Sequence, residues 1–143
     1  MNGRNQESSS EAIAAYEAIA MYGAVMVEAW GGGRSSDPSD TKNAFRASRV
    51  RDLGRLLTAT ELRSADRYWH VWHGNDSRSI YPKSYAPAVV GMMWDMMAQF
   101  QTWFGNAPYL AYGIQLLPLT PVSERRDNEQ WVSVLRRGVV GGI

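Results

Sequence analysis

Two glutamates near the amino end are the residues whose type and spacing best suit chemistry. Glu7 and Glu11 lie four residues apart, and on a helix this spacing places both carboxylates on one face, about 5–6 Å apart at Cβ. The same pair also has a structural explanation, because Glu11 completes a capping box with Ser8 and Glu7 would lie at the positive end of the helix dipole. Asn5 and Gln6 beside them add polar groups suited to sugar hydroxyls, although both are also ordinary residues at a helix start.

A second set of candidate ligands lies in the run WHVWHG. His70 and His73 could lie near one another at the end of a helix, where imidazoles can bind a metal ion or change charge near neutral pH. No nearby Asp, Glu or Cys completes a metal set, so a polar helix terminus explains the pair more simply. We therefore expect no metal and no other cofactor.

The glutamates need a helix to position them, and the sequence predicts one over residues 8–30. Apolar residues recur there at three- and four-residue steps, and Ser8 fits the N-cap. Residues 31–40 have the composition of an exposed loop. A second helical pattern covers residues 41–73, and Gly54 weakens its middle by about 1 kcal/mol relative to Ala, which allows a bend. Two helices with this connection predict an antiparallel hairpin.

The rest of the chain is less regular. Residues 74–106 begin with a loop-like stretch, which an apolar, Met-rich run around Trp94 follows. The apolar composition of this run predicts burial, but the spacing of its residues fits neither a helix nor a strand clearly. Thr120 and the proline after it predict the start of a last helix over residues 121–137. The sequence therefore predicts one helical hairpin and a last helix, with an irregular, loop-rich segment around residues 74–120.

Composition bounds the class of protein. The chain of 143 residues is 45% hydrophobic and 20% charged with 6 Trp and 7 Tyr, which fits one folded domain covering residues 1–143. A net charge of +1 argues against a nucleic-acid partner, and the lack of Cys excludes thiol chemistry. No stretch approaches the roughly 20 apolar residues of a membrane span, so we expect no membrane partner. The first ten residues have no signal-peptide pattern.

Several ordered motifs resemble glycoside hydrolase family 81, the endo-β-1,3-glucanases. The run GRNQESSSEAIAAY resembles the family's signature. The later blocks follow in the family's order: ELRSADRYWHV (Glu61–Val71), VVGMMW (Val89–Trp94), TWFG (Thr102–Gly105) and GIQLLPLTPVSE (Gly113–Glu124). Together they cover most of the chain between Gly3 and Glu124.

The resemblance implies an all-α fold, an (α/α)6 toroid built from helical hairpins around a sugar-binding cleft, and the predicted hairpin fits one of these hairpins. It also implies that residues 1–143 are the closing segment of that catalytic domain, because family members are several times longer. We therefore expect a fragment. A hairpin without its neighbours in the toroid exposes apolar flanks, so we expect self-association of the isolated chain.

The resemblance also implies an inverting mechanism on internal bonds of a β-1,3-glucan such as laminarin or callose. Glu7 would be the general base that activates water, and Glu11 would help to hold that water or orient the base. The family's general acid is an Asp upstream of this pair, and no Asp precedes Glu7 here. We therefore expect the isolated chain to be inactive unless the acid is supplied in trans. A retaining pair formed by Glu7 and Glu11 is disfavoured, because both would approach the sugar from one side.

The aromatic residues and one further acid are candidate substrate contacts. Apolar sugar faces pack on aromatic rings, and one or two of the ring-bearing residues are expected to face the cleft, Trp103 among them. Tyr112 stands where many family members carry His, which departs from the family's pattern. Glu124 is either a substrate contact or a carboxylate favoured by the first turn of a helix.

Two classes of function are consistent with these residues. The first is endo-hydrolysis of β-1,3-glucan, in a protein that we expect to be extracellular or in the cell wall. The second is a catalytically inactive helical remnant that binds β-glucan or only packs against protein.

Overall fold

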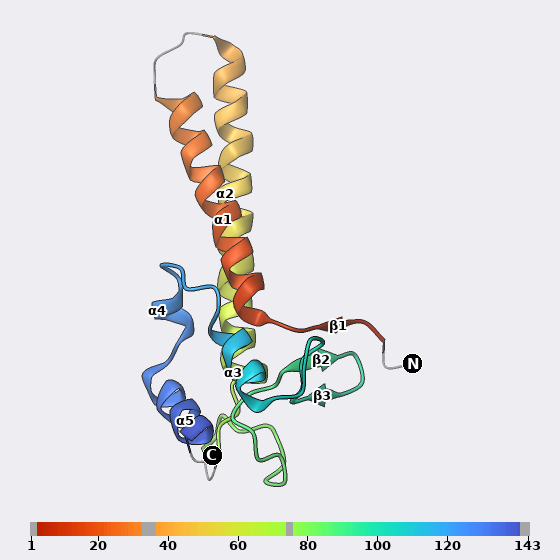
Figure 1. Ribbon diagram of the computed structural model, residues 1–143. Helices are drawn as coiled ribbons and strands as arrows, with labels where there is room; N and C mark the ends of the chain where they lie inside the picture. The colour runs from red at the N-terminus through yellow and green to blue at the C-terminus, as the bar shows by residue number, and fades with distance from the viewer. Residues whose placement is uncertain (1–2, 33–36, 74–75, 141–143) are drawn as a thin grey trace.

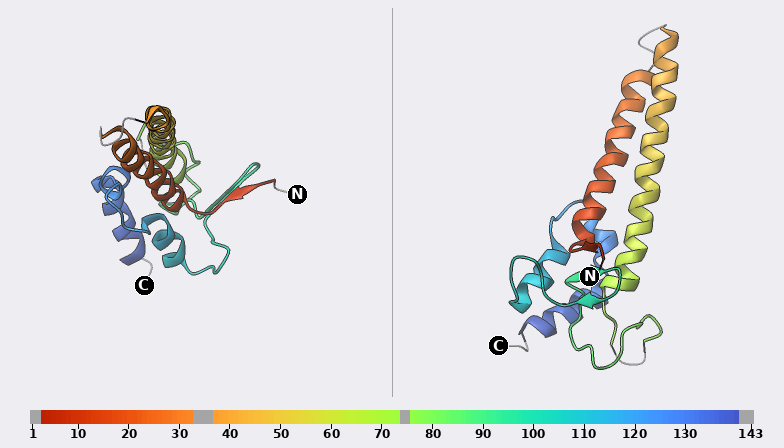
Figure 2. Two further views of the ribbon diagram at one scale, coloured as in Figure 1. Left: turned by 90° about the horizontal axis from the view of Figure 1, so that it is seen from above. Right: turned by 90° about the vertical axis from the view of Figure 1, so that its right-hand side faces the viewer.

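A computed structural model describes residues 3–32, 37–73 and 76–140. A long helical hairpin projects from a compact end that holds the remaining elements (Figures 1 and 2). Helix α1 (Ser9–Gly31) and helix α2 (Pro38–Ser64) form this hairpin. They run antiparallel along most of their length, so the predicted hairpin is confirmed.

The helix starts follow ordinary capping chemistry. Ser8 is the N-cap of α1, and its hydroxyl oxygen accepts the backbone N–H of Glu11 at 3.1 Å, as predicted. Helix α2 begins three residues before the predicted start. Asp37 caps it by accepting the N–H of Ser39 at 2.8 Å, and Pro38 occupies the first helical position.

Two glycines let the helices of the hairpin approach closely. A Cβ atom at Gly54 would lie 2.4 Å from the backbone nitrogen of Ala20, and one at Gly23 would lie 2.3 Å from that of Arg51. Gly54 sits within the continuous α2, so the bend considered there is absent. Gly54 is needed for backbone contact between the two helices. This close packing offsets the cost of a glycine in the middle of a helix.

The second helix ends earlier than the sequence predicts. After Ser64 the chain forms a single π-helical turn, η1 (Ala65–Trp69), and then becomes extended at His70. His70 pairs with Val89 in an isolated antiparallel bridge. The predicted helix to residue 73 is therefore wrong by about one turn, because this segment pairs with a distant stretch of chain.

A small sheet connects the amino end to the Met-rich run. Strands β1 (Asn5–Gln6), β2 (Met92–Trp94) and β3 (Ala98–Gln99) lie in the order β1-β2-β3, and each neighbouring pair is antiparallel. Asn5 is opposite Trp94 in this register. The apolar run without a clear period is thus a short hairpin to which the amino-terminal segment adds a third strand.

Three short helices complete the compact end. They are α3 (Pro108–Leu116), α4 (Ser123–Arg126) and α5 (Glu129–Val140). The segment 74–120 is therefore not irregular throughout, because α3 lies within it. The last helix is also not continuous over 121–137. Asn128 interrupts it and accepts the N–H of Gln130 through its side-chain oxygen at 2.9 Å, which starts α5 anew.

The core lies in the compact end. Its main cluster joins the segment after η1 to α3 and α5: Trp72, Ala88, Val89, Ala111, Tyr112, Trp131 and Leu135. A second cluster of Ile13, Ala65 and Val122 attaches the base of the hairpin. The predicted all-α class is confirmed, with the small sheet as an addition.

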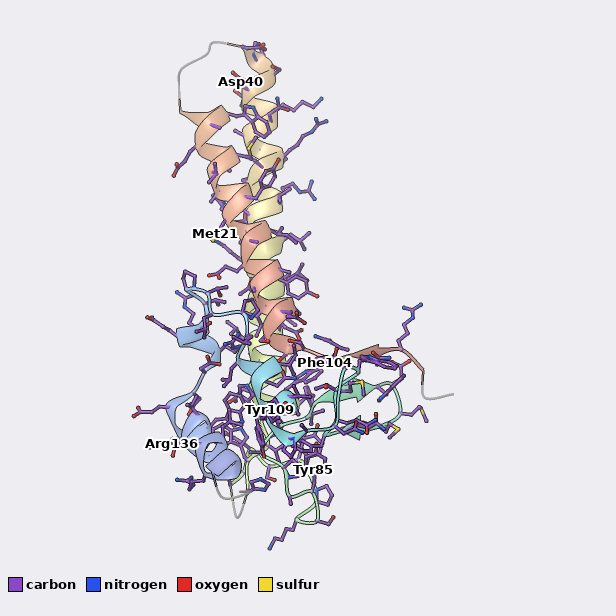
Figure 3. All side chains as sticks on the ribbon, in the orientation of Figure 1. Met21, Asp40, Tyr85, Phe104, Tyr109 and Arg136 are labelled. Carbon is purple, nitrogen blue, oxygen red and sulfur yellow. The ribbon has the colours of Figure 1, made fainter. Side chains whose placement is uncertain are left out.

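The hairpin carries large apolar side chains that face solvent. Met21, Tyr22, Val25, Phe45 and Leu56 are each 58–64% exposed, and Figure 3 shows Met21 on the hairpin above the compact end. Helix α1 is long and apolar enough to cross a membrane by length and composition. The sequence statement that no stretch approaches such a span is therefore wrong, although core helices of globular proteins pass the same test.

Candidate active site

Glu7 lies outside helix α1, at the junction between β1 and the helix. Because Ser8 is the N-cap, Glu7 precedes the first helical turn and does not share a helical face with Glu11. Glu11 is exposed on the first turn of α1, whereas Glu7 is only partly exposed. The separation expected for a pair on one helix therefore does not apply.

The carboxylate of Glu7 is held by the TWFG turn. The backbone N–H of Trp103 donates to Oε1 of Glu7 at 2.5 Å. Thr102 closes this turn by donating from both its backbone N–H and its hydroxyl to the carbonyl of Gly105. Among residues 3–32, 37–73 and 76–140, Trp103 is the one hydrogen-bond partner of the Glu7 carboxylate, so the second carboxylate oxygen stays available.

Trp103 also joins an aromatic surface beside Glu7. Its ring is 61% exposed and meets Trp94 of β2 edge to face, with 5.6 Å between ring centroids and 61° between ring planes. Its indole Nε1 donates to the side-chain oxygen of Asn5 at 3.2 Å. Asn5 thus meets two aromatic residues from a distant part of the sequence, Trp94 and Trp103, beside the small sheet.

Gln6 turns to the opposite side of β1, as alternation along a strand requires. Its amide nitrogen donates to Oε1 of Glu61 at 2.9 Å, near the end of α2. Glu61 opens the motif ELRSADRYWHV, but nothing in the local sequence indicated that it would lie near Gln6. A surface hollow of about 320 Å³ follows the strands here, lined by Arg4, Asn5, Gln6, Met93, Trp94 and Asp95.

Two of the expected substrate contacts lie elsewhere. Tyr112 is 7% exposed and packs edge to face on Phe100 within the main core cluster, so it supports the core and is not presented to a ligand. Glu124 is exposed on α4, which lies on the other side of α1 from β1 (Figure 1). The described structure therefore does not bring Tyr112 or Glu124 to Glu7.

The three serines after Glu7 form a buried polar cluster with α3. Ser9 donates to the side-chain oxygen of Gln115 at 3.0 Å, and Ser10 lies 2.6 Å from the carbonyl of Ile114. Ser8 and Ser10 are also hydrogen-bonded to each other at 2.8 Å. The run of three serines was the available signal for this cluster, although only Ser8, as the N-cap, was predicted to have a structural role.

His70 is a core residue, and the interpretation as a polar helix terminus is wrong for it. It is 1% exposed and stacks on Trp131 with 3.5 Å between ring centroids. Both ring nitrogens lack hydrogen-bond partners among the described residues. Burial, with a smaller contribution from the charge of Arg126, lowers the pKa of His70 from 6.5 to about 3. Within the described ranges, no group of three His, Asp or Glu residues is placed to hold a metal ion.

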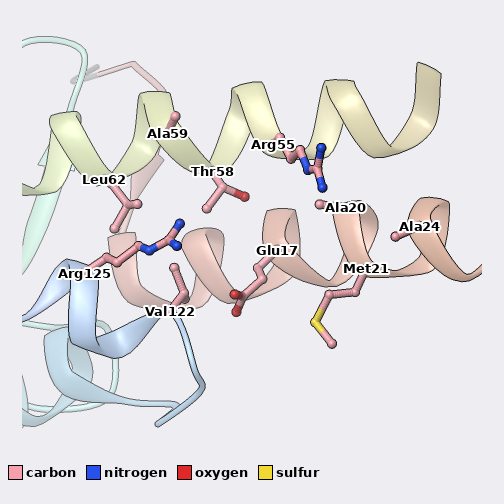
Figure 4. Close-up of a pocket in the computed structure, with 10 residues that line it drawn as sticks. All are labelled: Glu17, Ala20, Met21, Ala24, Arg55, Thr58, Ala59, Leu62, Val122 and Arg125. Atoms are coloured by element: carbon pink, nitrogen blue, oxygen red, sulfur yellow. The ribbon is translucent and has the colours of Figure 1, made fainter. Parts of the chain in front are cut away.

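A larger hollow of about 430 Å³ lies between α1, α2 and α4 (Figure 4). Its lining mixes aliphatic residues with the charged Glu17, Arg55 and Arg125, and none of the lining residues is aromatic. Such a lining suits a packed protein element better than a sugar ring, which favours an aromatic face. The hollow is therefore a weaker candidate for an active site than the surface around Glu7.

Comparison with known proteins decides the family. Residues 42–134, more than half of the chain, match the model of the glycosyl hydrolase family 81 C-terminal domain. A glucan endo-1,3-beta-D-glucosidase of Glycine max is 33% identical over 127 residues, which are 86% of this chain. The chain belongs to glycoside hydrolase family 81. The resemblance of the ordered motifs is thereby confirmed.

Two further comparisons extend this result. A glucan endo-1,3-beta-D-glucosidase of Thermobifida fusca is 30% identical over 83% of the chain. The solved structure of a mutant family 81 glycoside hydrolase from Clostridium thermocellum matches 97% of the chain with a TM-score of 0.71 at 24% identity, which shows a shared fold. The chain spans 16% of the Glycine max relative, 13% of the Thermobifida fusca relative and 16% of that solved chain.

Proposed function

We propose that this chain carries the general base of an enzyme that hydrolyses internal β-1,3-glucosidic bonds in laminarin- or callose-type glucan with inversion. Glu7 is that base. The observation that carries the proposal is the contact between its carboxylate and the Trp103 N–H, beside an exposed aromatic surface, in a family 81 chain. The names of the two similar glucosidases support the substrate class.

The geometry around Glu7 suits activation of a water molecule. The Trp103 N–H fixes one carboxylate oxygen, so the other can accept the proton of a water that attacks the anomeric carbon. Glu11 is exposed on the first turn of α1, and in this proposal it keeps the role that the family resemblance gives it, to hold this water or orient the base. The aromatic surface of Trp103, with the polar side chains of Asn5 and Gln6, would contact the sugar.

An inverting reaction also needs a general acid on the opposite side of the bond, with about 6.5–9.5 Å between the two carboxyl groups. The family resemblance assigns that role to an Asp upstream of the glutamate motif. We propose that polypeptide outside residues 1–143 supplies this Asp. Such an arrangement is possible if this chain forms the closing segment of an (α/α)6 catalytic domain. Secretion to the cell exterior or the cell wall, where such glucans occur, is part of the same proposal.

The test uses the longest natural polypeptide that contains this chain. Glu7→Gln keeps the shape of the side chain but removes the base, and we expect a loss of about 10²–10⁴-fold in kcat. Glu28→Gln, at an exposed position near the far end of α1, is the matched control and should keep full activity. NMR of the first product should show the α anomer. A β anomer, or full activity of Glu7→Gln, contradicts the proposal.

One observation favours a second candidate function. Large apolar side chains along the hairpin, such as Phe45 and Leu56, are exposed to solvent. Exposed apolar patches of this kind are typical of surfaces that bind another protein. They suit a catalytically inactive helical unit that packs against protein, with or without glucan bound at Trp103. Absence of any β-1,3-glucan hydrolysis by the longest polypeptide, with binding retained or lost, would favour this alternative.

A further inference from the structure

Gln115 is a fully buried side chain whose amide joins three parts of the chain. Its Nε2 donates to the carbonyl of Glu7 at 3.0 Å and to the carbonyl of Val90 at 3.2 Å. Its Oε1 accepts the hydroxyl of Ser9 at 3.0 Å. Gln115 lies on α3 and has 0% exposure, and its bonds to Ser9 and Val90 are buried, whereas its bond to Glu7 is partly buried.

We propose that Gln115 is the positioning residue of the Glu7 site, an inference that rests on the proposed function of Glu7. Glu7 lies before the N-cap, so no helical hydrogen bond fixes its backbone. Its carbonyl is instead held by Gln115, and its carboxylate is held by Trp103. The first contact places the residue, and the second orients its side chain.

The chemistry of the amide makes this role specific to Gln. Two N–H bonds on one nitrogen can serve two carbonyls at once, and the amide oxygen can accept a third hydrogen bond. Val90 is fully buried, so its carbonyl also depends on the same donor group. Met has nearly the same length and no donor, so Gln115→Met removes all three bonds while it keeps most of the packing volume.

The bond from Gln115 to the Val90 carbonyl connects the amino-terminal segment to the strand that pairs with it. Val90 lies two residues before β2, the strand that pairs with β1. The same amide therefore sets the end of β1 against the start of β2, and so sets Glu7 against the TWFG turn. Without it, the carbonyl of Glu7 loses its bond to Gln115, and the Glu7 backbone is held against Trp103 only through the neighbouring β1 contacts.

The matched control is Ser10→Ala. Ser10 belongs to the same buried cluster and bonds to the carbonyl of Ile114, but none of its bonds involves Gln115 or Glu7. Both variants lose buried hydrogen bonds and should unfold at lower denaturant concentration. Only Gln115→Met should change the placement of Glu7, so the two variants separate a positioning role from a structural one.

Two readouts report that placement. In the longest natural polypeptide that contains this chain, Gln115→Met should lower kcat on β-1,3-glucan by about 10–10²-fold with KM within about threefold, because misplacement of a catalytic group acts on the chemical step. In ¹⁵N-labelled protein, it should also move the Trp103 amide resonance upfield, since that proton loses its carboxylate acceptor. Ser10→Ala should leave kcat and the Trp103 resonance unchanged. If Gln115→Met does not fold, Gln115→Asn, which keeps the amide on a shorter stem, should move both readouts in the same direction by less.

The outcomes separate this inference from the proposed function. An unmoved Trp103 resonance and an unchanged kcat in a folded Gln115 variant overturn the positioning role. A resonance that moves while Glu7→Gln retains full activity supports the placement of Glu7 by Gln115 and overturns the role of Glu7 as base. Equal effects of Gln115→Met and Ser10→Ala on both readouts also overturn the inference, because they indicate a general structural contribution.

Discussion

Lowering the pH from 7 to 5 should destabilise the fold through His70. Burial against Trp131 lowers the pKa of His70 to about 3, whereas the unfolded chain takes up this proton near pH 6.5. Below pH 6.5 the unfolded state therefore binds a proton that the folded state excludes, and stability falls as the pH falls. A pH of 5 lies roughly 1.5 units below the pKa of His70 in the unfolded chain. At about 1.4 kcal/mol per unit, the free energy of unfolding should fall by about 2 kcal/mol.

Urea unfolding at pH 7 and pH 5 measures this difference. His70→Phe keeps a flat ring on Trp131 but removes the titrating nitrogens, so its two unfolding free energies should differ by far less than those of the wild type. His73→Gln, at an exposed position, is the control and should retain the full dependence. NMR should show a neutral His70 ring at pH 5 in the folded protein. A His70 resonance that titrates near pH 6.5, or equal pH dependence in wild type and His70→Phe, would refute the reasoning.

Three more outcomes are expected. Gly54→Ala should lower the melting temperature, by an overpacking cost of about 1–3 kcal/mol against the backbone of α1, while Gly113→Ala, where a Cβ meets nothing within 4 Å, should not. Trp103→Ala should weaken binding of laminarin oligosaccharides measured by calorimetry, while Ala at the similarly exposed Tyr109 should leave it unchanged. Residues 1–143 alone should self-associate in sedimentation experiments or bind a hydrophobic dye, and a monomer with a sharp thermal transition would contradict this.

The elements that depend on local sequence could be predicted. Regular apolar spacing and the cap at Ser8 were enough for α1, and the composition of residues 31–40 was enough for an antiparallel hairpin. Two features of the sequence were not interpreted correctly, and each has a physical reason. Pro108 lies at the first position of α3, but this helix has only nine residues, and a short apolar stretch of this kind is hard to distinguish from a buried strand by its spacing. Gly54 was interpreted through helix propensity, whereas its role is set by the helix that packs on it.

The candidate site could be predicted only in part. The sequence singled out Glu7, Asn5 and Trp103, and the structure brings these three together. Their arrangement could not be derived, because the contacts join residues more than ninety positions apart. The same limit applies to Gln115, which is an ordinary polar residue in the sequence and becomes a buried hub only when α3 meets the start of α1.

The long sequence separation between Glu7 and Trp103 has a consequence for synthesis. The hairpin of α1 and α2 rests on contacts between neighbours in the chain and can form while later residues are still being made. The surroundings of Glu7 need β2, the TWFG turn and Gln115, the last of which lies 108 positions further along. Glu7 is therefore made before any of these partners and gains them only later. A chain that stops between α2 and β2 would keep the hairpin and leave Glu7 without any of its hydrogen-bond partners described above.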